Sequence, residues 1–255
     1  MYKETDCCVD IVGIDCSTDI KKLGIAKGVF SSGELVITEV AIGQPNHVQI
    51  ISSWLKSSER TLIALDAPLG WPQAMGTNLV THKAGTVIDV ESNTMFRRHT
   101  DWFIKHKLNK QSLDVGSNLI ARTALFALKL IESIRKETGK QIPLAWSPKF
   151  SASCAAIEVY PAATLEARGI SSKGYKKSTP DKPSPLERRR EILGLLDGEF
   201  QVEFDEEMVV ANDDNLDAVL CLLAAADFLR DKAYKPSPDM KRTVEKESWI
   251  WVKRK

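Results

Sequence analysis

The chain has 255 residues, of which 43% are hydrophobic and 27% charged, and its 35 basic and 34 acidic side chains leave a formal charge of +1. These values are ordinary for a globular protein and exclude wholesale disorder. No apolar run approaches the ~20 residues that cross a bilayer, and no positive segment followed by an apolar one begins the chain, so we expect neither a membrane partner nor a secretion signal.

The first part of the chain predicts three strands joined by short connections. Apolar residues dominate residues 9–16, 23–30 and 34–42, as is typical of strands. The connection at 31–33 is short and holds Gly33, which favours an antiparallel hairpin, and the connection at 17–22 is also short enough for one. We therefore expect an antiparallel three-stranded meander.

A helix and a buried strand come next. Residues 46–58 carry apolar side chains at helical spacing, whereas residues 61–66 form a nearly continuous apolar run that is typical of a parallel strand covered on both faces. Residues 67–154 are predicted to be a helical and loop insert, in which residues 117–138 form a clear helix that ends at Gly139. The face expected to be buried on that helix consists of Leu119, Ile120, Ala124, Leu125, Leu128 and Ile131.

The last part of the chain predicts one more strand of the sheet and several helices. The strand spans residues 155–160, residues 249–252 are a candidate short strand, and the helices are expected at residues 161–168, 185–196 and 215–231, the last being the most apolar. The whole order predicts an α/β fold: a mixed five-stranded sheet, with three antiparallel strands followed by parallel ones, and helices on both faces. We expect a single domain over residues 1–255.

The neutral total charge hides two adjacent blocks of opposite sign. Residues 168–190 hold eight basic and two acidic side chains, whereas residues 197–217 hold nine acidic side chains and no basic one. The blocks can be two solvated faces that attract each other. They can also be a cation-binding site beside an anion-binding strip, and composition does not choose between these interpretations.

Three carboxylates stand where burial should exclude them. Asp15 ends the first strand, Asp66 ends the buried strand, and Asp217 lies within the most apolar helix. Burying an unpaired carboxylate costs several kcal/mol, and neighbouring carboxylates raise each other's pKa. A divalent cation removes both penalties, and two cations ~3.5–4 Å apart can hydrolyse a phosphodiester with water as the nucleophile. We therefore predict that these three residues bind two Mg²⁺ or Mn²⁺ ions and are catalytic.

Two further acidic residues are candidate metal ligands. Asp214 is three residues before Asp217 and so shares its helix face, and Glu158 lies in the predicted fifth strand. Each has a purely structural alternative, because Asp214 can cap the helix and a strand glutamate can face solvent. Asp15 and Asp66 can likewise be strand-end turn residues. The conjunction of all these carboxylates favours the metal site.

Several short motifs follow one another along nearly the whole chain. They are Gly13-Ile14-Asp15, Ala64-Leu65-Asp66-Ala67-Pro68-Leu69-Gly70, Arg97-Arg98-x-x-Asp101, Glu158-Val159-Tyr160-Pro161, Tyr175-Lys176 and Asn215-Leu216-Asp217-Ala218. In this order they resemble an uncharacterised bacterial family of predicted RNase H-like nucleases, and Asp214-x-x-Asp217-Ala218 is similar to a motif of RuvC-type junction resolvases. The resemblance implies an RNase H-like fold and a nuclease.

Basic residues supply candidate contacts to the substrate. Arg97 and Arg98 can bind phosphate through their guanidinium groups, and Lys176 and Lys177 can hold a nucleic-acid backbone while Tyr175 stacks on a base. A surface ion pair and a solvated loop are the alternatives. We expect DNA or RNA as the partner, and a homodimer stays open.

The first phosphate-loop pattern supplies an alternative function. Residues 13–18, followed by a hairpin, also resemble the start of actin-like ATPases and sugar kinases. Those folds need a duplicated domain and a glycine-rich adenosine motif, and the 14 glycines include no Gly-Gly pair. An ATP phosphotransferase of that kind and a non-catalytic nucleic-acid or protein binding module remain the alternatives. The five cysteines, with no CxxC pair, argue against a disulfide framework or a zinc site and favour the cytoplasm.

Overall fold

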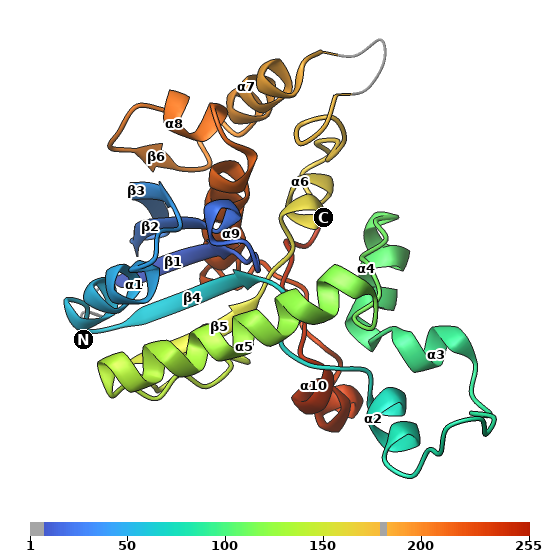
Figure 1. Cartoon of the computed structure of the whole chain (residues 1–255). Helices are drawn as coiled ribbons and strands as arrows, with labels where there is room; N and C mark the ends of the chain where they lie inside the picture. Colours follow the sequence, from blue (N-terminus) through green and yellow to red (C-terminus); the bar gives the residue numbers. More distant parts are fainter. Residues whose placement is uncertain (1–7, 179–182) are drawn as a thin grey trace.

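The computed structural model describes residues 8–178 and 183–255. One of the five cysteines, Cys7, and one lysine of the basic block, Lys182, therefore lie outside the described residues. Its centre is a mixed sheet in the order β5-β4-β1-β2-β3-β6 (Figure 1). The strands are β1 (Val9–Asp15), β2 (Gly24–Ser31), β3 (Glu34–Ile42), β4 (Thr61–Asp66), β5 (Cys154–Glu158) and β6 (Gln201–Val202). Strand β2 is antiparallel to β1 and β3, whereas β4 is parallel to β1 and β5. The predicted mixed α/β fold is confirmed.

The strand count of five was wrong by one. Strand β6 pairs in parallel with β3 through only two residues, Gln201 and Val202, and it lies within the acidic block. So short a strand carries no alternating pattern that a sequence argument could detect. The candidate strand at residues 249–252 forms only an isolated bridge, between Ile250 and Glu158.

Helices cover both faces of the sheet. The longer ones are α1 (His47–Lys56), α4 (His99–Leu108), α5 (Asn118–Thr138), α7 (Pro185–Leu195) and α9 (Asp213–Leu229). The shorter ones are α2 (Gln73–Leu79), α3 (Ser92–Phe96), α6 (Pro161–Glu166), α8 (Glu207–Val210) and α10 (Lys241–Glu247), with 3-10 turns at Ile20–Lys22 and Pro238–Met240. Figure 1 shows α1 and α5 on one face of the sheet and α9 on the other. No helix among the described residues is both long and apolar enough to pass through a bilayer.

The buried face of α5 agrees with the predicted one at Ala124 and Ile131 but differs at other positions. Leu119 and Leu125 are 66% and 49% exposed, and the helix buries a stripe rotated away from them. That stripe consists of Ala124, Ala127, Leu130, Ile131 and Ile134. Two of these five residues are alanines, and small residues of this kind are weak markers in a hydrophobic pattern.

Helix α9 packs directly on the strands because two glycines make room for it. A Cβ atom on Gly13 of β1 would collide with the backbone carbonyl of Ala218 and would lie 3.1 Å from the backbone nitrogen of Leu222. A Cβ atom on Gly24 of β2 would collide with the carbonyl of Asp214. The backbone of the helix therefore touches the backbone of the sheet, close to the end of β1 at which Asp15 lies.

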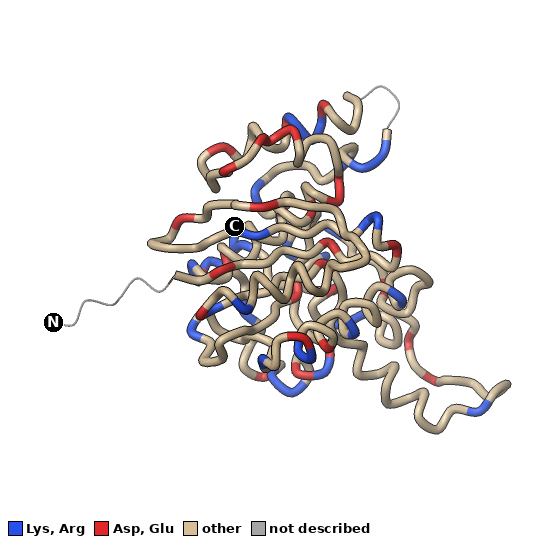
Figure 2. Tube along the Cα trace, turned by 60° about the vertical axis from the view of Figure 1, so that its left-hand side comes forward, with Lys and Arg blue, Asp and Glu red and all other residues tan. Residues whose placement is uncertain are grey.

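The two charge blocks attract each other. Arg190 pairs with Glu207 at 2.9 Å, and Arg168 pairs with Glu199 at 3.3 Å, so that basic and acidic positions lie side by side in the upper part of Figure 2. This supports the first interpretation of the blocks for these pairs. The lysines at positions 173, 176 and 177 line a cleft that Asp66, the last residue of β4, also lines.

Candidate metal centre

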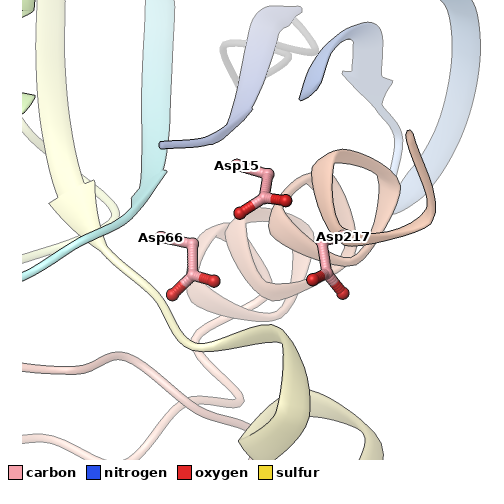
Figure 3. A group of neighbouring side chains, drawn as sticks. All are labelled: Asp15, Asp66 and Asp217. Carbon is pink, nitrogen blue, oxygen red and sulfur yellow. The ribbon is translucent and has the colours of Figure 1, made fainter. Parts of the chain in front are cut away.

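Three carboxylates from three elements meet at the edge of the sheet. Asp15 and Asp66 are the last residues of β1 and β4, and the parallel register of these strands places them directly beside each other. Asp217 reaches them from the second turn of α9. One oxygen from each carboxylate lies within 4.8 Å of the others (Figure 3). The structure thus brings together the three residues that the sequence singled out as the catalytic set.

The alternation of the strands explains why these side chains share one face. On β1, Val12 and Ile14 pack into the core beside α1 and α5, whereas Ile11 packs into the core beneath α9. Asp15 is two residues beyond Gly13, which contacts α9, and therefore points to the α9 face. Asp66 is two residues beyond Ala64, which packs in the core beneath α9, and therefore points to the same face.

Burial raises the pKa of all three carboxyls, and repulsion within the cluster raises the pKa of Asp15 and Asp66 further. Burial raises the pKa of Asp15 well above its ordinary value, and the charges of Asp217 and Asp66 raise it further. The pKa of Asp66 rises to about 7, mainly through burial and then through Asp217. Burial also raises the pKa of Asp217, although Lys176 and a hydrogen bond from Tyr175 act in the opposite direction. A bound cation would relieve this repulsion and would stabilise the charged carboxylates.

The donor set fits a hard divalent cation. All three groups offer carboxylate oxygens, and two metal–oxygen bonds of ~2.0–2.6 Å span about the spacing seen between them. Magnesium and manganese prefer such ligands over nitrogen or sulfur. Asp15, Asp66 and Asp217 are therefore the residues that would hold the metal.

A lysine and a tyrosine from one loop contact the cluster. The hydroxyl of Tyr175 donates a hydrogen bond of 2.8 Å to Oδ1 of Asp217, and the ammonium of Lys176 contacts Oδ2 of the same carboxylate. Tyr175 is only 3% exposed. Its expected role in stacking on a base is incompatible with this burial, whereas its hydrogen bond to Asp217 was missed because no sequence pattern indicates it.

Glu158 and Arg98 lie together in a buried ion pair outside the cluster. The guanidinium of Arg98 donates to Glu158 at 2.8 Å and to Asp101 at 3.0 Å, and it also donates to the backbone carbonyl of Glu247 at 3.0 Å. The backbone N–H of Leu69 donates to the same Glu158 carboxylate. Arg98 is 2% exposed and its donors are occupied within the protein, and Glu158 is not part of the group of three aspartates.

The face of the sheet explains why Glu158 is separated from the three aspartates. It pairs with Leu65 of β4, which packs in the core beside α5, whereas Asp66 points to the α9 face. A residue beside Leu65 therefore points away from Asp66. The same period-two argument that groups Asp15 with Asp66 separates Glu158 from them.

The remaining predicted residues lie at varying distances from the cluster. Asp214 is not part of the group of three, and burial together with Asp213 raises its pKa to about 6. Arg97 donates to Asp114 at 2.9 Å and to Gln111 at 3.2 Å, beside α4. Lys177 lines the cleft described next.

A cleft of about 500 Å³ opens at the aspartates and carries several lysines. It is bounded by α6 and by the loop that contains Tyr175. Its lining includes Asp66, Lys110, Tyr160, Ser172, Lys173, Lys176, Lys177 and Asp217. A second cavity of about 270 Å³ shares Asp66, Tyr160 and Lys176 with it, and its other lining residues include Arg98, Glu158, Pro68 and Ile120. Lys110 and Ser172 were not identified from the sequence, because single polar residues in loops carry no pattern, and Tyr160 appeared there only as part of the motif at residues 158–161.

Comparisons with known proteins identify a family. A family model described as "Protein of unknown function (DUF429)" matches residues 13–241. No curated protein matches the chain. Among solved structures, the chain is similar to Thermus thermophilus RuvC in complex with Holliday junction substrate, with 12% sequence identity, 86% of this chain and 94% of that chain covered, and a TM-score of 0.32.

Proposed function

The chain belongs to the DUF429 family, whose description assigns no activity, and we propose from the site that it is a metal-dependent nuclease that hydrolyses phosphodiester bonds of nucleic acid with two Mg²⁺ or Mn²⁺ ions. The observation that carries the proposal is the convergence of Asp15, Asp66 and Asp217 within 4.8 Å, beside a lysine-lined cleft whose lining includes Asp66 and Asp217. The sheet combines the antiparallel strands β1 to β3 with the parallel strands β4 and β5, as the sequence predicted. We place the protein in the cytoplasm.

In this proposal the aspartates bind the cations and a lysine of the cleft binds the phosphates. Asp15, Asp66 and Asp217 would hold the cations, and without cations their negative charge would repel the phosphodiester. Cations held there would lower the pKa of a bound water and would stabilise negative charge on the phosphoryl oxygens. Lys177 contacts the phosphates that flank the scissile bond. Attack by water needs no covalent intermediate on the protein.

Asp15→Asn tests the proposal. The substitution keeps the shape of the side chain but removes one anionic ligand, so cleavage of single- and double-stranded DNA and RNA should be lost in Mg²⁺ and in Mn²⁺ while the circular dichroism spectrum is unchanged. Asp10→Asn is the matched control, because Asp10 lies at the other end of β1, away from the cluster. Equal cleavage by both variants would end the assignment.

A parallel assay addresses the phosphotransferase alternative. ATP turnover without nucleic acid is measured under the same conditions. Turnover of ATP that depends on Asp15, with no cleavage of any nucleic acid, would replace the nuclease proposal with a nucleotide-hydrolysing one.

A further inference from the structure

Both oxygens of the Asp217 carboxylate are already engaged by two consecutive loop residues. Tyr175 donates to Oδ1 at 2.8 Å, and the Lys176 ammonium contacts Oδ2. Among the ion pairs of the described residues, the pair between Lys176 and Asp217 is the one that reaches the aspartate cluster. A divalent cation that uses Oδ2 must therefore meet or displace this ammonium.

The two contacts differ in how easily they can be broken. The ring of Tyr175 is 3% exposed and packs within the core beneath α9, so its hydroxyl is fixed by the fold. The side chain of Lys176 is 43% exposed and lies over the ring of Tyr175, with its ammonium 5.7 Å from the ring centre. Its flexible four-carbon stem allows the ammonium to leave Asp217 once a cation takes over its charge interaction with the carboxylates.

The surroundings give the displaced ammonium a place to go. Lys176 lines both the lysine-rich cleft and the second cavity, and Asp66 lines both as well. The ammonium therefore stands between the cluster and the space into which a phosphate would enter. A short movement would transfer it from a protein carboxylate to a ligand oxygen.

We propose that Lys176 is a resident counter-ion of the aspartate cluster, which a divalent cation displaces from Asp217 and which then binds the phosphate of the substrate. The inference rests on the proposed function for the identity of the cation and of the substrate. The single positive charge balances part of the cluster's negative charge while no metal is bound. Cation binding and phosphate binding are then linked, because each requires the ammonium to leave Asp217.

The first experiment measures Mn²⁺ binding by titration calorimetry in the absence of nucleic acid. Lys176→Gln removes the competing charge and should tighten Mn²⁺ binding about tenfold or more, as expected for the loss of a contacting like charge. Lys173→Gln is the matched control, because Lys173 is exposed and lines the same cleft without contacting the cluster, and its affinity should stay within about twofold of the wild type. The difference should persist at ~0.5 M KCl, where charges farther apart than ~4 Å are screened.

The second experiment uses the unaltered protein, so that it does not depend on the folding of a variant. Amine-reactive labelling followed by mass spectrometry compares the modification rates of Lys176 and Lys173 with and without Mn²⁺. Release of the ammonium should make Lys176 react several-fold faster when Mn²⁺ is bound, while Lys173 reacts at an unchanged rate.

Two results would overturn the inference: Mn²⁺ affinity of Lys176→Gln equal to or weaker than that of the wild type, or a labelling rate of Lys176 that Mn²⁺ leaves unchanged or lowers. Neither experiment contains nucleic acid. If both give the expected results and no nucleic acid is cleaved, the proposed nuclease function fails while the counter-ion role of Lys176 stands.

Discussion

Replacing Asp66 by asparagine should stabilise the metal-free protein at pH 8. The folded state holds the proton of this carboxyl up to about pH 7, whereas the unfolded chain releases it near 3.8, so the free energy of unfolding falls as the pH rises between these values. The difference of about three pKa units corresponds to ~4 kcal/mol at 1.36 kcal/mol per unit. Because Asp66 shares its protons with Asp15 and Asp217, we expect ~2–4 kcal/mol of stabilisation in Asp66→Asn.

Urea unfolding in EDTA, followed by tryptophan fluorescence, measures this effect. The buried Trp249 and Trp251 provide the signal. Asp66→Asn and the wild type should have similar stabilities near pH 4 and diverge as the pH rises toward 8. Glu39→Gln, which neutralises an exposed residue of β3, is the control and should follow the wild type throughout.

Added Mn²⁺ should narrow the difference in stability between the two proteins. A ligand at one hundred times its dissociation constant stabilises the folded state by ~2.7 kcal/mol, and the wild type should gain more of this than Asp66→Asn does. If Asp66→Asn were no more stable than the wild type at pH 8 in EDTA, the three carboxylates would not be in electrostatic conflict and the reasoning about the cluster would fail.

Two substitutions outside the cluster test the frame that supports it. Arg98→Ala leaves Glu158 and Asp101 buried without their cation and should lower the free energy of unfolding, measured in urea, by ~3–5 kcal/mol. Arg97→Ala breaks a partly exposed ion pair and should lower it by less than ~1 kcal/mol. Equal losses in the two variants would contradict the role of the buried ion pairs. Gly13→Ala should lower the unfolding free energy by ~1–3 kcal/mol and weaken Mn²⁺ binding in calorimetry because α9 must move, and unchanged binding would show that this contact does not position Asp217.

Much of the framework could be predicted from local patterns. The strand predictions agree with β1 to β5 to within two residues at each end, because each strand is a short apolar run with clear breaks. The helices α1, α5 and α9 follow in the same way from their spacing and capping residues. Asp15, Asp66 and Asp217 stood out because charge inside an apolar run conflicts with burial.

The limits of prediction lie where the fold depends on partners distant in the chain. Glu158 resembled a metal ligand until its strand register was known, since its face is set by pairing with Leu65. Arg98 was predicted to bind phosphate, and its ion pair with Glu158, 60 residues away, could not be predicted from the sequence. The hydrogen bond from Tyr175 depends on the course of a whole loop, which no periodicity encodes.

The contact between Gly13 and α9 has a consequence for how the cluster tolerates change. The backbones of β1 and α9 are in direct contact there, so the distance from Asp15 to Asp217 is set by backbone contact and does not depend on side-chain packing. Substitutions that add or remove methyl groups elsewhere in the core leave this distance unchanged. Substitutions at the leucines and valines around α9 should therefore alter melting temperature far more than cation affinity, and drift in the interior need not erode the chemistry at its edge.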